Sequence, residues 1–106
     1  MIKINILVTG AAGFIGSTVV NQLQPEFQKL RAIDNFSIGT VENIKGIKVK
    51  NMDVRNKEDV KNMVKDIDII IHFAGMTGIP LCEKKPKKAT ENNFVGTKNL
   101  IDAAIK

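Results

Sequence analysis

The chain has 106 residues, of which 43% are hydrophobic and 25% are charged, a composition typical of one soluble domain. It contains no tyrosine, so chemistry that needs a tyrosine acid or base is excluded for this chain acting alone. A single cysteine, Cys82, and a single histidine, His72, exclude an internal disulfide and a Cys/His metal site, and they favour a reducing, cytoplasmic compartment. The formal net charge of +5 permits attraction to anions without selecting any one of them.

Four short segments are predicted to be strands. Residues 2–8, 30–33, 47–52 and 69–73 are apolar and rich in β-branched side chains, which is typical of strands that are covered on both faces. The first segment is too short to span a membrane and lacks the flanks of a signal peptide, so we expect no membrane association.

Three segments have the spacing of helices. Apolar residues recur at i, i+4 and i+8 over 15–23, and Pro25 ends the pattern. Asn56 is a suitable N-cap for a second helix, which has two acidic residues in its first turn. A third helix is expected over 86–106, whereas the segment 35–46 is expected to be a loop with at most one or two helical turns.

The alternation of strands and helices predicts an α/β fold with a parallel sheet and right-handed crossovers. Four strands, expected in the order 3-2-1-4, form about half of a doubly wound, Rossmann-type nucleotide-binding sheet. We expect residues 1–106 to form one unit and, because a further strand would be due at the end of the sequence, to be a truncated form of a longer protein.

A glycine-rich motif, TGAAGFIG, joins the first strand to the first helix. At such a turn, glycines let a pyrophosphate approach the main chain, and the N–H groups and dipole of the helix bind its charge. Gly10 is expected to make the turn, Gly13 to permit the close approach, and Gly16 to let the helix pack on the strand. The motif lacks the G-K-[ST] ending of a P-loop, which disfavours ATP hydrolysis.

Asp34 stands at the expected end of the second strand. An acidic side chain about 20 residues beyond the glycine motif accepts hydrogen bonds from the adenosine ribose of a dinucleotide, and its charge repels a 2′-phosphate. The sequence therefore predicts NAD, rather than NADP, as the cofactor. The alternative is that Asp34 only caps the turn before Asn35.

Five segments, TGAAGFIG, DNFSIG, MDV, HFAG and NNFVGT, occur in an order and spacing that resemble the N-terminal half of the extended short-chain dehydrogenase/reductases. Within that family they are most similar to the NAD-dependent nucleotide-sugar epimerases and dehydratases of the UDP-glucose 4-epimerase type. The resemblance covers practically the whole chain and is much less specific for the sugar than for the family. It implies a full-length parent that binds a UDP-sugar or another nucleotide sugar and transiently oxidises a sugar hydroxyl with NAD.

The same resemblance implies a role for each matched residue. Phe14 and Ile15 join the three glycines of the motif at the pyrophosphate. Asp53, by its carboxylate, and Val54, by its backbone, border the adenine. The remaining implied positions, from the adenosine end to the nicotinamide end, are Asp34, Asn35, Ser37, Phe73, Ala74, Gly75 and Asn93. The alternatives are that Asp53 is a solvated residue at the start of the next helix and that Asn93 is a plain exposed asparagine.

Other features are interpreted as structural. His72 lies in an apolar strand and is interpreted as a structural histidine rather than a catalytic acid or base. Cys82 has no histidine nearby in the sequence and is interpreted as a spectator. The lysines around Pro86 favour a solvated face over nucleic-acid binding, because no aromatic residue is interleaved for stacking. The apolar residues of the helix over 86–106 occupy a wide arc, which predicts self-association, as in a homodimer.

The resembled family uses a Tyr-x-x-x-Lys pair on the substrate hydroxyl, and this chain has no tyrosine. We therefore expect no catalytic residue here, and an NAD-binding part of a nucleotide-sugar epimerase or dehydratase that turns nothing over alone. Two alternatives stay open at this point. One is a non-catalytic module that senses NAD or organises a partner protein, and the other is a basic nucleic-acid binder with an incidental Rossmann half.

Overall fold

A computed structural model describes residues 2–36, 39–73 and 95–105. In chain order the helices and strands are β1 (Ile2–Thr9), α1 (Phe14–Leu23), β2 (Phe27–Asp34), β3 (Asn43–Ile44), β4 (Ile47–Lys48), β5 (Lys50–Asn51), α2 (Lys57–Met63), β6 (Ile69–His72) and α5 (Gly96–Ile105). Four of the expected cofactor-binding residues, Ser37, Ala74, Gly75 and Asn93, lie outside the described residues, as do Cys82 and the lysines around Pro86.

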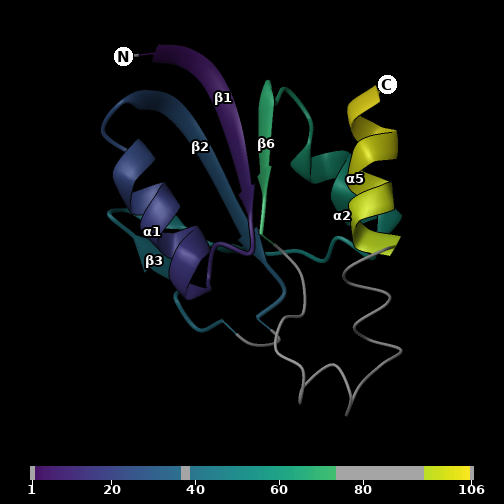
Figure 1. The fold of residues 1–106 in the computed structure, drawn as a ribbon, viewed down its shortest axis with the longest axis horizontal. Coiled ribbons are helices and arrows are strands. Elements are labelled where there is room, and N and C mark those ends of the chain that lie inside the picture. Colours follow the sequence, from purple (N-terminus) through teal and green to yellow (C-terminus); the bar gives the residue numbers. More distant parts are fainter. Residues whose placement is uncertain (1, 37–38, 74–94, 106) are drawn as a thin grey trace.

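The centre of the fold is a parallel sheet with the strand order β5-β2-β1-β6 (Figure 1). β5 and β6 fall inside the segments expected as the third and fourth strands, so the arrangement in space agrees with the expected α/β sheet. The described chain nevertheless contains β3 and β4 in addition, which form a separate two-stranded sheet.

The prediction of one continuous strand over 47–52 was wrong. Ile47 and Lys48 pair with β3 in an antiparallel hairpin, and only Lys50 and Asn51 pair with β2. The hairpin turns at Lys45–Gly46, where both residues have positive φ angles of 49° and 89°. Two such residues form the tight turn that suits a two-residue hairpin, so this turn draws Ile47 and Lys48 into a pairing with β3 and leaves Lys50 and Asn51 to pair with β2.

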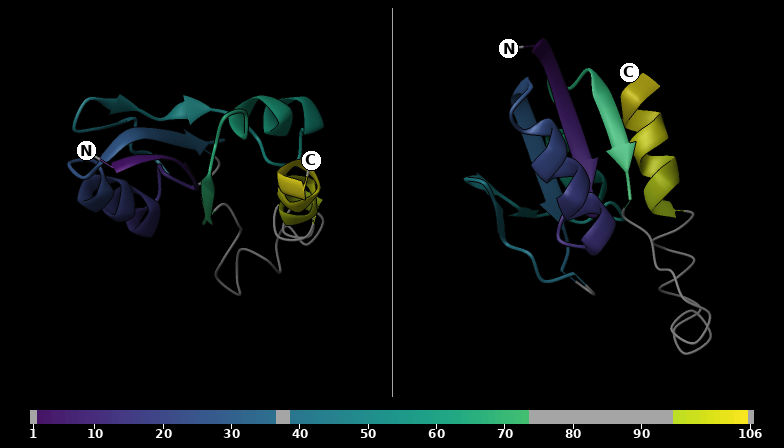
Figure 2. Two further views of the ribbon diagram at one scale, coloured as in Figure 1. Left: turned by 90° about the horizontal axis from the view of Figure 1, so that it is seen from above. Right: turned by 60° about the vertical axis from the view of Figure 1, so that its left-hand side comes forward.

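Apolar residues cover both faces of the sheet because alternate side chains of a strand point in opposite directions. Ile6 and Val8 of β1 pack with Val20 of α1 on one face, whereas Leu7 packs with Val60 of α2 on the other. Leu100 of α5 joins the second face. Two views of the ribbon show β1 and β2 between α1 and the pair formed by α2 and α5 (Figure 2).

The ends of α1 and α2 follow from their sequences. α1 ends at Leu23, just before Pro25, as the sequence predicts. Asn56 caps α2, because its side-chain Oδ1 accepts hydrogen bonds from the N–H groups of Glu58 (2.9 Å) and Asp59 (3.1 Å). Among the helices of the described segments, none is long and apolar enough to cross a membrane.

The register of the sheet brings the carboxyl ends of its strands to one edge. Thr9 pairs with Ile33 on one side and with His72 on the other, and Asp34 pairs with Asn51. The segments that leave β1, β2, β5 and β6 therefore begin side by side. In open α/β sheets, ligands bind at this edge.

Candidate functional site

The glycine loop, defined here as residues 10–16, connects β1 to α1 and is held in place by main-chain hydrogen bonds. Gly10 has a φ angle of 69°, which favours glycine, and its carbonyl accepts a hydrogen bond from the N–H of Gly13 (3.2 Å). The Ala11 N–H donates to the Ile33 carbonyl of β2 (3.1 Å). The Ala12 carbonyl accepts from the N–H groups of two residues beyond β2, Thr40 and Val41, each at 3.1 Å.

Main-chain N–H donors without an intrahelical acceptor remain at the start of α1. The first turn contains no acidic residue, and its N-cap, Gly13, provides no side-chain hydrogen bond. The Ser17 N–H is the first to reach a main-chain acceptor within the helix, the Gly13 carbonyl at 2.9 Å. The preceding N–H groups of Phe14, Ile15 and Gly16 have no intrahelical acceptor, as at any helix N-terminus. The Phe14 and Ile15 side chains are 86% and 61% exposed, so this end of the helix is open to a ligand.

The glycines of this region serve different purposes. A Cβ atom at Gly16 would lie 2.1 Å from the Gly10 carbonyl oxygen, so only glycine lets α1 approach the loop. The expectation that Gly16 packs against the strand is thus refined, because the close contact is with the loop that follows the strand. A Cβ atom at Gly13 would have no neighbour closer than 3.5 Å, which is an ordinary contact. The protein's own packing does not require glycine at 13, whereas an approaching ligand would.

Asp34 connects the end of β2 to the glycine loop. Its side chain is 9% exposed, Oδ2 accepts a hydrogen bond from the Ala12 N–H (3.0 Å), and Oδ1 accepts from the Phe36 N–H (2.8 Å). The turn-capping alternative is therefore part of the structure, since the bond to Phe36 closes a turn. The second bond goes beyond it and brings the carboxylate to the expected pyrophosphate loop.

Asp53 and Asn35 meet at the ends of β5 and β2. The Asn35 Nδ2 donates to Asp53 Oδ2 (3.3 Å), and the Arg55 Nε lies 3.0 Å from both Asp53 carboxylate oxygens. The hydrogen bonds from the Arg55 side chain hold the pKa of Asp53 below its ordinary value, although partial burial acts in the opposite direction. Asp53 is therefore an ion-paired carboxylate and not the freely solvated residue of the alternative interpretation.

The loop of residues 53–56, called the adenine-side loop here after the role that the sequence resemblance implies, has nearly all of its main-chain groups satisfied. The Asp53 N–H donates to Asp59 Oδ2, and the Asp53 carbonyl accepts from the Asn56 N–H, both at 3.0 Å. The Arg55 N–H donates to Asp53 Oδ1 (2.9 Å). For the Val54 N–H, the residues that the structure describes provide no acceptor.

His72 lies between two threonines at the end of β6. Its Nδ1 is 2.6 Å from the Thr9 hydroxyl and its Nε2 is 2.9 Å from the Thr97 hydroxyl of α5. The Thr9 hydroxyl also accepts from the Phe73 N–H (3.1 Å). Burial lowers the pKa of His72, because the charged imidazolium loses hydration. Both ring nitrogens bind protein hydroxyls, which supports the interpretation of His72 as a structural residue.

The structure brings the described candidates to one edge of the sheet: Gly10, Gly13, Phe14, Ile15, Gly16, Asp34, Asn35, Asp53, Val54 and Phe73. The sequence reasoning missed Gly39, at which a Cβ atom would lie 2.5 Å from the Ala12 carbonyl carbon. It also missed Arg55, Thr97 and Asn99. Only Gly39 had a usable local signal, since an isolated glycine in a loop indicates a close backbone approach.

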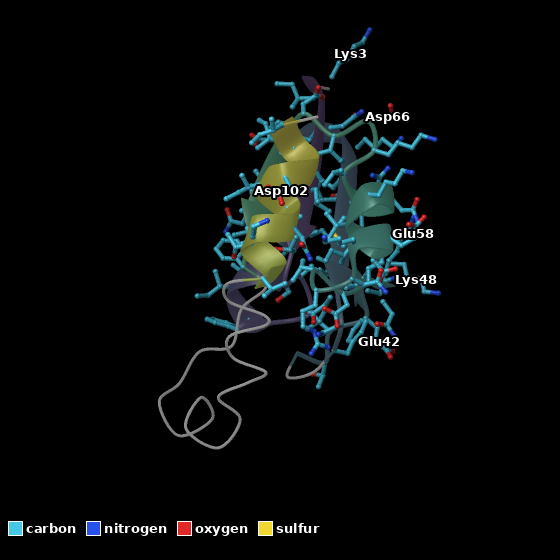
Figure 3. The ribbon with its side chains drawn as sticks, turned by 90° about the vertical axis from the view of Figure 1, so that its right-hand side faces the viewer. Lys3, Glu42, Lys48, Glu58, Asp66 and Asp102 are labelled. Carbon is cyan, nitrogen blue, oxygen red and sulfur yellow. The ribbon has the colours of Figure 1, made fainter. Side chains whose placement is uncertain are left out.

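A groove of about 490 Å³ lies between α2 and α5. Figure 3 shows α5, which carries Asp102, beside α2, which carries Glu58. The groove is lined by Lys57, Glu58, Val60, Lys61, Val64, Asn99, Asp102 and Ala103. Its charged lining has both signs, and none of the expected cofactor-binding residues contributes to it.

A parallel sheet with a glycine-rich strand-to-helix turn and an acidic residue at the end of the second strand defines the Rossmann-type dinucleotide-binding class. A model of the NAD dependent epimerase/dehydratase family matches residues 6–106. The chain belongs to this family.

Individual relatives match nearly the whole of this chain. A UDP-glucose 4-epimerase of Pisum sativum is 35% identical over 115 residues, which cover 95% of this chain and 33% of that protein. An uncharacterized membrane protein of Methanocaldococcus jannaschii is 34% identical, with 94% and 32% covered. The crystal structure of the Thermus thermophilus UDP-glucose 4-epimerase in complex with NAD superposes with a TM-score of 0.85 at 32% identity, with 95% and 33% covered. The chain thus spans about a third of the length of these relatives.

Proposed function

We propose that the chain binds NAD across the carboxyl edge of its sheet and forms the NAD-binding part of a nucleotide-sugar epimerase or dehydratase. One observation carries the proposal: the start of α1 offers main-chain donors without a side-chain cap, beside a position, Gly13, that the fold itself would let carry a side chain. An anionic ligand that approaches the main chain accounts for both features.

The diphosphate would lie on the N–H groups of Phe14, Ile15 and Gly16. These donors point out of the first helical turn, and the helix dipole favours an anion there. The glycine loop is tied to β2 and to Thr40 and Val41 by its own hydrogen bonds, so it is ordered before a ligand arrives. Preorganised donors bind more tightly because less entropy is lost on binding.

The adenosine half would lie across the ends of β2 and β5. The Asp34 carboxylate accepts two hydrogen bonds from protein N–H groups, and an ionised carboxylate has lone pairs for about four. It can therefore still accept from the ribose hydroxyls. The adenine edge presents an acceptor and an amino donor. The acceptor is complementary to the Val54 N–H, and the amino group would replace the long Asn35 contact (3.3 Å) on the Asp53 carboxylate, whose other contacts are made by Arg55. Asp34 would repel a 2′-phosphate, so the chain is proposed to prefer NAD over NADP.

The reaction of the whole protein is proposed from the family alone. When bound, NAD supplies a hydride acceptor for a sugar hydroxyl. The residues described here would bind and orient it, with Phe73 and His72 near its nicotinamide half. This chain contains no tyrosine, so the proton transfer that the family performs with Tyr-x-x-x-Lys would belong to residues outside these 106.

Calorimetric titration with NAD tests the proposal. At one hundred times the dissociation constant, NAD is expected to stabilise the chain by about 2.7 kcal/mol. Gly13→Val is expected to abolish the heat of binding while the unfolding midpoint without NAD stays close to wild type, because the new side chain occupies ligand space. Asn21→Ala, an exposed change on α1, is the matched control and should bind normally. An absence of binding heat with folded wild-type protein contradicts the proposal.

Self-association through the helix that the sequence predicts over 86–106 is part of the same proposal. On its described part, α5, Ile101 and Ile105 are 54% and 78% exposed, and exposed apolar area favours association. Sedimentation equilibrium is expected to give a dimer that Ile101→Glu with Ile105→Glu converts to a monomer. A monomer for the wild-type chain at high concentration contradicts it.

A further inference from the structure

Asn99 is a buried polar side chain of α5 that the proposed cofactor contacts do not use. It is 6% exposed, and its side-chain Nδ2 donates to two consecutive carbonyls, those of Val54 (3.0 Å) and Arg55 (3.3 Å). Both carbonyls belong to the adenine-side loop. A buried amide that satisfies one buried and one partly buried carbonyl is costly to remove, because the carbonyls would lose their partner.

The bonds from Asn99 complete the restraint of the adenine-side loop. The Asp53 N–H binds Asp59, the Asp53 carbonyl binds the Asn56 N–H, and Arg55 binds the Asp53 carboxylate. The first half of the loop is therefore held by residues that are close to it in the sequence. Asn99 holds the second half from α5, through the Val54 and Arg55 carbonyls. The Val54 N–H lies in the same peptide plane as the Asp53 carbonyl, which binds the Asn56 N–H, and Asn99 holds the next peptide plane through the Val54 carbonyl. The direction of the Val54 N–H is therefore restrained from both sides.

We propose that Asn99 is a positioning residue for adenine recognition. By binding the Val54 and Arg55 carbonyls, it keeps the Val54 N–H and the Asp53 carboxylate aimed together at the edge of the base. The inference rests on the proposed NAD binding. It adds that α5 sets the preference for adenine, although no atom of Asn99 would touch the cofactor.

The same helix also reaches the nicotinamide side of the proposed site. Thr97, two positions before Asn99, binds His72 at the end of β6. The first turns of α5 therefore provide one polar side chain toward each half of the proposed dinucleotide site, Asn99 and Thr97. A change at Asn99 should affect only the adenine half, because the Thr97 contact stays in place.

Nicotinamide hypoxanthine dinucleotide separates this role from a general effect on folding. It differs from NAD only in the base, where a carbonyl replaces the amino group and N1 carries a proton, so neither hydrogen bond of the adenine-side loop can form. The wild-type chain is expected to bind NAD about tenfold or more tightly than this analogue, since two hydrogen bonds are lost.

In Asn99→Leu we expect that preference to fall about fivefold or more, with the affinity for the analogue changed by less than about twofold. Asn62→Leu, at an exposed asparagine of α2, is the matched control and should keep the wild-type preference. Asn99→Ala removes the same amide but lets water reach the carbonyls, so it provides a second measurement if Asn99→Leu does not fold. Circular dichroism checks the fold of each variant.

Four results would overturn the inference, and they are distinguishable. An unchanged preference for NAD in folded Asn99→Leu would show that Asn99 does not position the loop. An equal loss of affinity for both dinucleotides in folded Asn99 variants would show that Asn99 only stabilises the structure. A wild-type chain that binds both ligands equally would remove adenine recognition from the loop but leave NAD binding standing. A wild-type chain that binds neither would overturn the proposed function together with the inference.

Discussion

The glycine loop and the adenine-side loop are held in place by opposite means. The glycine loop is fixed mainly by main-chain contacts, which are possible because Gly16 and Gly39 have no side chains. The adenine-side loop is fixed by side chains, namely Arg55, Asp59 and Asn99. The difference agrees with the proposed roles, because a diphosphate site would need an approachable main chain, whereas recognition of a base edge would need one donor and one acceptor held at a set angle.

The largest expected effect is a difference in stability loss between alanine substitutions at two glycines of the same loop, Gly16 and Gly13. Gly16→Ala is expected to lower the free energy of unfolding by about 3 kcal/mol, because the new methyl group would overlap the Gly10 carbonyl. Gly13→Ala is expected to change it by less than about 1 kcal/mol, since the position has a φ angle of −84° and free space. Urea denaturation without NAD measures both. Equal losses at the two positions would show that the loop does not distinguish packing glycines from ligand glycines.

The second-largest expected effect tests the hydrogen bond by which Asp34, at the end of β2, holds the glycine loop. Asp34→Ala is expected to cost about 2 kcal/mol, because the buried Ala12 N–H loses its acceptor. Urea denaturation is again the measurement, and Glu42→Ala, an exposed carboxylate, should leave the stability within about 0.5 kcal/mol of wild type. A neutral Asp34→Ala would mean that the carboxylate does not anchor the loop. Because this variant weakens the fold, Gly13→Val is the cleaner test of NAD binding.

The third effect concerns His72, the only histidine of the chain. Its pKa is lowered from 6.5 by burial, so the unfolded chain binds a proton more readily than the folded one. Stability is therefore expected to be constant above the unfolded pKa and to fall as the pH drops below about 6.5. Urea midpoints between pH 8 and pH 5 measure this, and His72→Gln should flatten the profile over that range. A wild-type profile as flat as that of the variant would contradict the buried, neutral histidine.

The smallest effect concerns Asp53 and the ion pair of the adenine-side loop. Its lowered pKa contributes stability that is present above the unfolded value of about 3.9 and is lost as the pH falls through the folded value. The pair is partly exposed, with side-chain exposures of 30% for Arg55 and 23% for Asp53, so the contribution to stability is expected to be small. A carbon-13 titration of the Asp53 carboxyl should therefore be used, and Arg55→Gln should raise its midpoint. An unchanged midpoint would mean that Arg55 does not control this carboxylate.

Much of the architecture could be predicted from neighbouring residues. The glycine motif, the N-cap Asn56 and the stop at Pro25 act over a few positions, and each agrees with the structure. The strand expected over 47–52 was wrong because its apolar pattern overrode the weaker turn signal of Lys45–Gly46. Short apolar segments do not show by themselves which sheet they join.

By itself, the sequence determined the alternation of strands and helices in the parallel sheet and the place of the glycine loop, because these features depend on periodicity and on local backbone preferences. It did not determine the hairpin of β3 and β4. Only the tertiary structure decided which polar groups the protein uses for itself and which it leaves for a ligand. The Asp34 bond to Ala12 and the Asn99 bond to Val54 join residues 22 and 45 positions apart. Such contacts depend on how the packed elements meet, and no local pattern in the chain encodes them.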